Sequence, residues 1–292
     1  MRRYKILHRT YYNFTAPVRL EQHALRLRPR EGYELHIEAS TLKITPTANL
    51  RWHRDVEDNS VAIATFASSA SQLLIESEVI IQQYNEAPLD FLVAHYATEY
   101  PFTYLPEDKI VLAPYMMEFT AQLPAQLEPQ LPDTTLAEWV ATLWQPGERI
   151  QTYALLERLG THIQKTLTYR IREEPGVQSA VETLLLGTGS CRDFAYLFME
   201  SARHLGLAAR FVSGYLHTQP ASTDFGATHA WAEVFLPGAG WKGFDPTLGE
   251  IVGTKHIAVA VARLPQLVPP VAGSFVGPPG AELDVGVWVT AL

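Results

Sequence analysis

The sequence predicts an α+β protein in which an N-terminal β-sandwich precedes helices that pack on an antiparallel sheet. Three observations predict it. Roughly the first hundred residues consist of runs rich in β-branched and aromatic side chains, and several runs alternate apolar with polar. The middle of the chain carries apolar residues at three- and four-residue steps, as amphipathic helices do. Strand-like runs return after residue 207, with turns that contain Gly and Pro between them.

Length and composition fit two modest domains, or one domain with a large extension. The chain has 292 residues, of which 47% are hydrophobic and 18% charged, as suits a protein with a sizeable core. We divide it into a β-sandwich domain at 1–110, a Pro-rich linker with short helices at 111–147, and a mixed domain at 148–292.

The β-sandwich prediction rests on four strand-like runs, and the turn-forming "EDNS" divides one of them into a hairpin. The runs lie at 4–14, 35–46, 50–66 and 72–84. No catalytic pattern occurs in them. A structural or substrate-shaping role is therefore the interpretation for this domain.

Helices are predicted after the prolines that recur between 101 and 132. Segments with helical periodicity lie at 134–144, 146–169, 179–189 and 190–207. Asp133 is a plausible cap for the first of them. Strands are predicted at 208–217, 228–237, 240–247 and, at the end of the chain, 282–292.

The only cysteine, Cys191, is placed where a thiol becomes reactive. Ser190 and Asp193 form an S-x-x-D pattern ahead of an apolar helical run, which is a capping-box signature. Cys191 is then the first residue of a helix, where unpaired amides and the helix dipole stabilise a thiolate, and Arg192 adds a nearby positive charge. The alternative is an inert core cysteine, because buried cysteines are common.

A nucleophilic cysteine needs a base, and the base needs an orienting partner. His229 opens the strand "THAWAEVFL" and Asp245 closes the strand "WKGFDPT". If these strands form a hairpin through the turn "PGAG", both residues lie at its open end. The residue counts on the two arms are unequal, so a bulge or a slipped register would be needed to place the two residues directly opposite each other. His229 would then take the proton of Cys191, and Asp245 would orient the imidazole ring.

These motifs together resemble the core of the bacterial transglutaminase-like superfamily, a group of papain-like cysteine enzymes. The resemblance rests on a G-x-C helix start, an R-x-x-G-Y strand, an H-A-W-x-E-V strand and a W-x-x-F-D-P strand, in that order between about 150 and 250. It implies that 148–292 is a catalytic domain with its cysteine at a helix N-terminus packed on an antiparallel sheet. It assigns Cys191 as nucleophile, His229 as general base and Asp245 as orienting acid.

The first hundred residues resemble an extra domain found ahead of this core in one bacterial branch of the family. Trp231 matches an aromatic residue beside the catalytic histidine, although packing alone is an alternative role. Arg192 stands where a glutamine or lysine often follows the cysteine. That departure leaves the triad intact.

The chemistry that the resemblance implies is acyl transfer through a thioester, with a peptide or protein amide as substrate. We favour a cysteine protease or amidase. The alternatives are a protein-glutamine transamidase with the same triad, and a non-catalytic peptide-binding module. The amide N–H of Cys191 is the simplest oxyanion donor, and Tyr169 is a candidate for a second.

Other classes of function are disfavoured. The formal net charge of −8 argues against a nucleic-acid surface. No stretch approaches the length needed to cross a membrane, and neither a signal-peptide core nor a cysteine pair for a disulfide occurs, so we expect a cytoplasmic protein. No zinc, EF-hand or phosphate-loop spacing occurs, so we expect no metal and no cofactor. The oligomeric state is left open.

Overall fold

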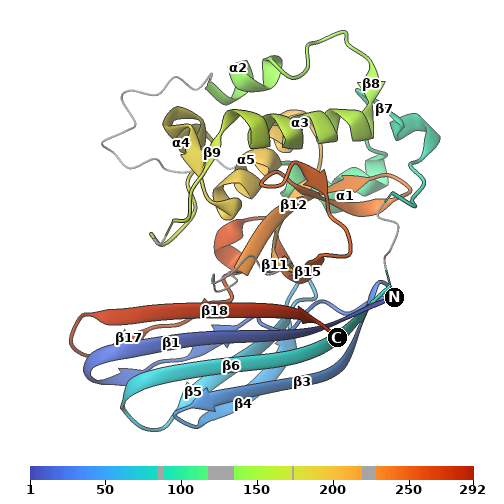
Figure 1. Cartoon of the computed structure of the whole chain (residues 1–292). Coiled ribbons are helices and arrows are strands. Elements are labelled where there is room, and N and C mark those ends of the chain that lie inside the picture. The colour runs from blue at the N-terminus through green and yellow to red at the C-terminus, as the bar shows by residue number, and fades with distance from the viewer. Residues whose placement is uncertain (85–88, 118–134, 173, 219–227) are drawn as a thin grey trace.

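A computed structural model describes residues 1–84, 89–117, 135–172, 174–218 and 228–292. The fold is mixed, with helices and several antiparallel sheets, as the sequence predicts at that level. In Figure 1 a layer of long strands lies at the bottom, a second sheet that includes β11, β12 and β15 lies above it, and the helices α2 to α5 lie on top. The sheet that carries the candidate site is therefore covered on both faces.

The bottom layer is built around one long strand, β1, which pairs with β18 on one side and with β6 on the other. β6 also pairs with β3, and β17 continues the pairing of β1 at its far end. Alternate residues of β1 are buried on one face only, as expected for a half-buried antiparallel strand. The strands are β1 (Arg2–Leu20), β3 (Leu35–Thr45), β6 (Ala70–Gln83), β17 (Phe275–Val276) and β18 (Ala281–Ala291).

A second N-terminal sheet has the strand order β16-β2-β5-β4. The predicted hairpin at "EDNS" is confirmed, because β4 and β5 pair antiparallel from Arg54 and Ser60 outwards. One apolar cluster draws side chains from both N-terminal sheets, including Phe14 and Leu73 from the first and Ala62 from the second. The strands are β2 (His23–Leu25), β4 (Ala48–Arg54), β5 (Ser60–Phe66) and β16 (Val271–Ala272). A β-sandwich in the strict sense stays a prediction.

The upper sheet is antiparallel, with the order β14-β13-β12-β11-β15. Its strands are β11 (Ala209–Leu216), β12 (Thr228–Leu236), β13 (Gly240–Asp245), β14 (Glu250–Ile251) and β15 (His256–Ala262). Short pairs are formed by β7 (Glu99–Tyr100) with β8 (Ile150–Gln151) and by β9 (Thr168–Tyr169) with β10 (Thr188–Gly189).

The helices pack on the upper face of this sheet, where a large apolar cluster joins α3, α5 and the even-numbered residues of β12. The helices predicted at 134–144, 179–189 and 190–207 appear close to their expected bounds, whereas the helix predicted at 146–169 begins at Thr152. The elements are α1 (Pro106–Met116), α2 (Thr135–Ala141), α3 (Thr152–Thr166), α4 (Ala180–Leu186) and α5 (Cys191–His204), with single-turn helices at His95–Ala97 and Pro265–Leu267. The predicted cap of α2, Asp133, lies outside the described residues.

Two features go beyond the sequence-based division at 110 and 147, which itself stays a prediction. Helix α1, which is 11 residues long, crosses the predicted boundary at 110 and begins within the segment assigned to the β-sandwich domain. The last strands, β16 to β18, pair with strands of the first hundred residues. Both ends of the chain therefore lie in one sheet, side by side in Figure 1, and the amide of Leu292 donates to the carbonyl of Arg3.

The bottom layer packs on the lower face of the upper sheet. Tyr4 and Ile6 of β1 and Ile81 of β6 share an apolar cluster with Tyr215 and Ile257 of the upper sheet. This junction brings the N-terminal region against β11 and β15.

Candidate active site

Cys191 is the first residue of α5, as the sequence predicts, and its side chain is partly buried. Ser190 is the N-cap, and Ser190 and Asp193 form the predicted capping box. The first amides of a helix have no partner within the helix, so the thiol lies beside unpaired N–H donors at the positive end of the dipole. The buried stripe on α5, which includes Phe194 and Phe198, holds this helix start against the core.

The carboxylate of Asp193 ties the start of α5 to its surroundings. It is fully buried, and its Oδ2 accepts from the amide of Ser190 at 2.8 Å and from the Ser190 hydroxyl at 2.7 Å. Oδ1 accepts from the amide of Gln178 at 2.8 Å, and Arg172 Nε lies 3.3 Å from Oδ2 as an ion partner. A buried carboxylate needs such compensation. The network fixes the backbone on which the thiol is carried.

Arg192 has a structural role in addition to the positive charge predicted from the sequence. Its Nη2 donates to the backbone carbonyls of Arg172 and Glu174, so the guanidinium fastens the preceding loop to the helix start. The charge still lies one residue from the thiol. Its hydrogen bonds, however, serve loop anchoring.

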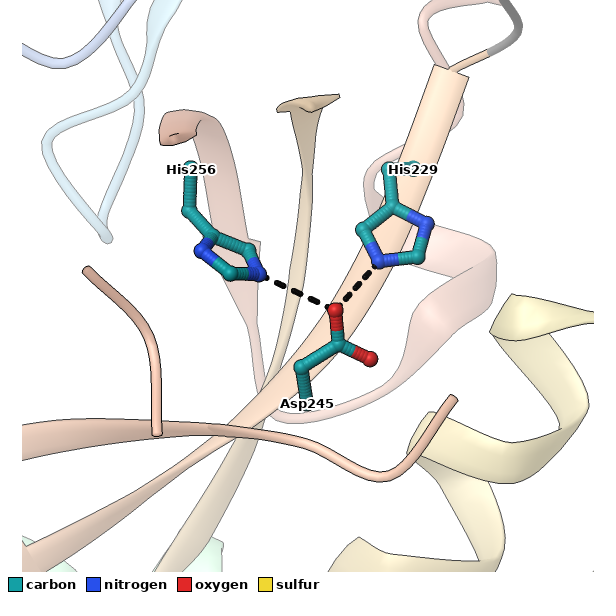
Figure 2. Close-up of side chains that lie close together, drawn as sticks. All are labelled: His229, Asp245 and His256. Atoms are coloured by element: carbon teal, nitrogen blue, oxygen red, sulfur yellow. Dashed lines mark hydrogen bonds and ion pairs between the residues drawn. The ribbon is translucent and has the colours of Figure 1, made fainter. Parts of the chain in front are cut away.

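His229 and Asp245 lie together at the open end of the β12–β13 hairpin. Their side chains are joined by a hydrogen bond of 2.6 Å from His229 Nε2 to Asp245 Oδ2 (Figure 2). The two residues are not directly opposite, and the pairing needs no bulge: it is regular from Ala232–Phe244 to Leu236–Gly240. Extending that register places Asp245 opposite Trp231, and His229 is its diagonal neighbour on the same face, which side chains of this length can span.

The third residue of the predicted triad, Cys191, lies near this pair. Interactions with Cys191 contribute to the raised pKa of His229, which indicates that the thiol is close to the imidazole ring. Because His229 uses Nε2 for Asp245, Nδ1 is the ring nitrogen available to the sulfur. The structure thus brings together all three residues that the sequence singles out.

A fourth residue, His256, was not singled out by the sequence. It opens β15, and its Nε2 lies 3.0 Å from the same carboxylate oxygen, Asp245 Oδ2 (Figure 2). The other oxygen, Oδ1, accepts from the amides of Thr247 at 2.9 Å and Leu248 at 3.3 Å. The only signal in the sequence is a histidine at the start of a strand, and ten histidines dilute it.

Charge within the site is stabilised by these contacts. Burial opposes the charged form of His229, but hydrogen bonds and charge interactions with Asp245 and Cys191 outweigh burial and raise the pKa of His229 to about 10. Burial likewise opposes ionisation of Asp245, yet the hydrogen bonds from His229 and His256 hold the pKa of that carboxyl far below its usual value. At neutral pH the pair is an imidazolium beside a carboxylate.

His229, Asp245 and His256 are also residue types that can bind a metal ion. One ligand atom each from His229, Asp245 and His256 lie within 4.8 Å of one another. The amide of Gly253, however, donates to His256 Nδ1 at 3.3 Å, so that nitrogen carries no proton and Nε2 carries it instead. For Nε2 to bind a metal, the proton would have to move to Nδ1, where it would face the Gly253 N–H; on Nε2 it is donated to Asp245 instead. The cluster fits hydrogen bonding better than metal coordination.

Two aromatic residues lie beside the candidate triad of Cys191, His229 and Asp245. Trp231 is 1% exposed, and its ring centroid lies 6.2 Å from that of His229 and 5.2 Å from that of His256. Tyr169 is 47% exposed and packs edge-on against Phe194. Burial, followed by the charges of Cys191 and Asp245, raises the pKa of Tyr169, which indicates that its hydroxyl lies near the site.

Within the described ranges, no helix combines the length and apolar character required to span a bilayer. The cytoplasmic location expected from the sequence stays a prediction.

Comparison with known proteins identifies relatives along the whole chain. Uncharacterized proteins of Mycobacterium tuberculosis and Mycobacterium bovis are 29% identical over 98% of this chain and 92% of their own length. An uncharacterized protein of Mycobacterium leprae is 35% identical over 39% of this chain and 42% of its own length.

A solved structure shares the fold. The crystal structure described as "a Putative Cysteine Protease from Cytophaga hutchinsonii" superimposes with a TM-score of 0.73, covers 100% of this chain and 91% of that chain, and is 16% identical. At this identity the likeness concerns the fold alone.

Two family models match successive parts of the sequence. The model of the bacterial transglutaminase-like N-terminal region matches residues 4–82, and the model of the transglutaminase-like superfamily matches residues 147–246. The second match contains Cys191, His229 and Asp245. This chain therefore belongs to the transglutaminase-like superfamily and carries the N-terminal region of its bacterial branch.

Proposed function

We propose that this protein is a papain-like cysteine protease or amidase that cleaves peptide or isopeptide amides through a thioester. One observation carries the proposal: the 2.6 Å hydrogen bond between His229 and Asp245, placed within reach of a cysteine at a helix N-terminus. An inert cysteine needs neither a base nor an oriented carboxylate. A non-catalytic peptide-binding module would not need them either, which weighs against that alternative.

In the first half of the reaction, Cys191 Sγ attacks the amide carbonyl carbon and the S–C bond forms. The oxyanion of the tetrahedral intermediate is stabilised by the Cys191 amide at the start of α5, and Tyr169 is our candidate for a second donor. His229 gives its proton to the amine nitrogen as the C–N bond breaks. The amine leaves, and a thioester remains on Cys191.

In the second half, a water molecule approaches the thioester and gives a proton to His229 as its oxygen attacks the carbonyl carbon. The C–S bond then breaks, the acid product leaves, and the thiolate–imidazolium pair is restored. Asp245 keeps its charge throughout and stabilises the imidazolium. If a primary amine replaces the water, the same residues perform transamidation.

Alkylation tests the activation of the thiol without knowledge of the substrate. Cys191 is the only cysteine, so iodoacetamide labelling of the chain reports on this residue alone. We expect native protein at pH 6 to react at least tenfold faster than the same chain unfolded in urea, whose thiol has an ordinary pKa of about 8.5. Equal rates in the two states would refute the proposal.

A second experiment identifies the reaction. A library of peptide amides is incubated with the protein, acid quenching traps the thioester, and mass spectrometry identifies the acyl group on Cys191. Adding a fluorescent primary amine then separates the outcomes, because hydrolysis yields a free acid and transamidation a labelled product. A Cys191→Ala variant that retains full activity would contradict the proposed nucleophile.

A further inference from the structure

His256 contributes a second imidazole to the triad carboxylate. Figure 2 shows His229 and His256 converging from two directions on one oxygen, Asp245 Oδ2, at 2.6 and 3.0 Å. The His256 side chain is 1% exposed and the Asp245 side chain is fully buried, so water does not compete for this contact. A buried hydrogen bond to a carboxylate is both strong and directional.

The proton positions at His256 follow from its neighbours. The Gly253 amide donates to Nδ1, which leaves the proton on Nε2, where it is donated to Asp245. His256 is therefore a neutral donor. The backbone of His256 also closes the preceding turn, because the His256 amide donates to the Gly253 carbonyl at 2.9 Å.

These contacts determine the direction of the carboxylate. The Thr247 and Leu248 amides hold Oδ1, which leaves Oδ2 as the oxygen whose position sets the His229 hydrogen bond. His256 is the second donor on that oxygen. Without the donor from His256, the Asp245 carboxylate would be held by the two amides on Oδ1 and by its hydrogen bond with His229. His229 is the base that this carboxylate must orient.

The position of His256 depends in turn on the N-terminal region. β15 pairs with β11 along one edge, and its other edge receives contacts from the first hundred residues. Gln83 Nε2 donates to the His256 carbonyl at 3.0 Å, and the Arg30 amide donates to the Ala258 carbonyl at 2.8 Å. Edge strands are commonly covered in this way.

A third contact lies at the far end of β15. The fully buried Asn59 side chain accepts from the Val261 amide and donates to the Val261 carbonyl, each at 2.8 Å. The amide side chain thus pairs with the strand as a backbone segment would. Gln83, Arg30 and Asn59 together hold the outer edge of β15 from the residue that follows the loop to its penultimate residue.

We propose that His256 is a positioning residue for Asp245, and that the N-terminal region contributes to activity by holding β15 and His256 in place. This inference rests on the proposed function, since it concerns the orientation of the same triad. It gives the N-terminal region a role in the chemistry that acts through β15. Other charged groups line the 300 Å³ cavity beside His256, namely Arg30, Glu31, Glu34, Arg210 and Glu233.

The test compares His256→Leu with His256→Gln by the pH dependence of Cys191 alkylation. Leucine removes the donor, and glutamine offers an N–H donor of similar reach. We expect His256→Leu to slow alkylation at pH 6 by about tenfold or more, as loss of an orienting partner commonly does. Its acid limb should move about one pH unit upward, because a misaligned Asp245 stabilises the imidazolium less. His256→Gln should remain within about threefold of the wild type.

Each outcome decides. An unchanged limb in folded His256→Leu, or a limb that moves to lower pH, overturns the positioning role. The second result would mean that His256 competes with His229 for Asp245. Equal slowing in the leucine and glutamine variants would also overturn it. Wild-type protein without enhanced alkylation would instead refute the proposed function, so the two failures are distinguishable.

A second pair of variants tests the N-terminal region while leaving His256 in place. Gln83→Met removes the donor to the His256 carbonyl, and Gln82→Met is the control, since Gln82 points away and donates to Glu38. We expect a threefold or larger loss of alkylation rate at pH 6 for Gln83→Met and no change for Gln82→Met. Equal rates for the two variants, with both folded by circular dichroism, would overturn the role of the N-terminal region.

Discussion

Two buried histidines, His8 and His229, illustrate how neighbours decide what an imidazole does. His8 lies where the bottom layer meets the upper sheet, and its partners are the hydroxyls of Tyr215 at 3.2 Å and Thr10 at 2.9 Å. Burial lowers the pKa of His8 to about 4. His229 is also buried, but Asp245 and Cys191 outweigh burial and raise its pKa to about 10.

The difference lies in the charge of the partner. Hydroxyl groups satisfy the hydrogen bonds of a neutral ring without repaying the cost of burying a charge, so His8 stays neutral. A carboxylate repays that cost, so His229 holds a proton that it can transfer. The same residue type is therefore part of the framework in one region and of the chemistry in the other.

The largest expected effect comes from removing the carboxylate charge of Asp245, because that charge makes His229 behave differently from His8. Asp245→Asn keeps the shape of the side chain but replaces the carboxylate partner of His229 with a neutral amide. Its pKa should then fall, and amide hydrolysis should drop roughly 10³–10⁴-fold, as it does when a triad carboxylate is neutralised. Alkylation at pH 6 should approach the rate of the unfolded chain.

The control for this change is Asp284→Asn, which removes an equal charge from an exposed position of β18. It should leave both rates unaltered. Alkylation of Asp245→Asn at the wild-type rate would show that the carboxylate does not activate the site.

Acid pH tests the other histidine. The folded pKa of His8 is below that of an unfolded histidine, so its contribution to stability is complete above pH 6.5 and is lost as pH falls towards 4. Between pH 7 and 4.5 we expect about 2.5 kcal/mol of unfolding free energy to be lost through this group. Urea unfolding at both pH values measures it.

His8→Gln isolates that contribution from those of the other groups that titrate. The variant should lose correspondingly less stability on acidification, while His53→Gln, at an exposed position of β4, should behave as the wild type does. Equal acid sensitivity of His8→Gln and wild-type protein would contradict the assignment.

How far the sequence predicts this site depends on the range of each signal. Ser190 and Asp193 are three residues apart, so the capping box and the start of α5 were legible. His229 and Asp245 were legible because one hairpin joins them. His256 reaches Asp245 from β15, which β11 and β12 separate from β13 in the sheet, and no local pattern encodes that proximity.

The same limit applies to the fold. β18 was predicted as a strand from its alternation, yet its pairing with β1 joins residues 4 and 291, for which the sequence holds no spacing rule. The hairpin register adds a different case. Unequal residue counts rule out a directly opposite pair in a regular hairpin, but diagonal neighbours on one face meet in a regular register.

The smallest expected effect tests whether the two regions are independent. Gly214 lies between them on β11, since Tyr215, the partner of His8, follows it, and Trp231 beside His229 packs on it. A Cβ at position 214 would lie 2.4 Å from the Ile257 carbonyl oxygen and 2.6 Å from Trp231 Cη2. Gly214→Ala should therefore cost about 1–3 kcal/mol of stability, whereas Gly32→Ala, with open space around it, should cost far less.

Whether Gly214→Ala changes the alkylation rate, the acid sensitivity of stability or both shows how β11 connects the two regions. If β11 transmits the strain both ways, Gly214→Ala should slow Cys191 alkylation at pH 6 and also change the acid sensitivity that His8 confers, because both rings rest on neighbours of this glycine. If only the alkylation rate changes, Trp231 has moved, while the packing of the bottom layer on the upper sheet around His8 is unchanged. The second result would show that the framework histidine and the reactive histidine are separated by a rigid strand, and that the N-terminal region reaches the triad through β15 and not through β11.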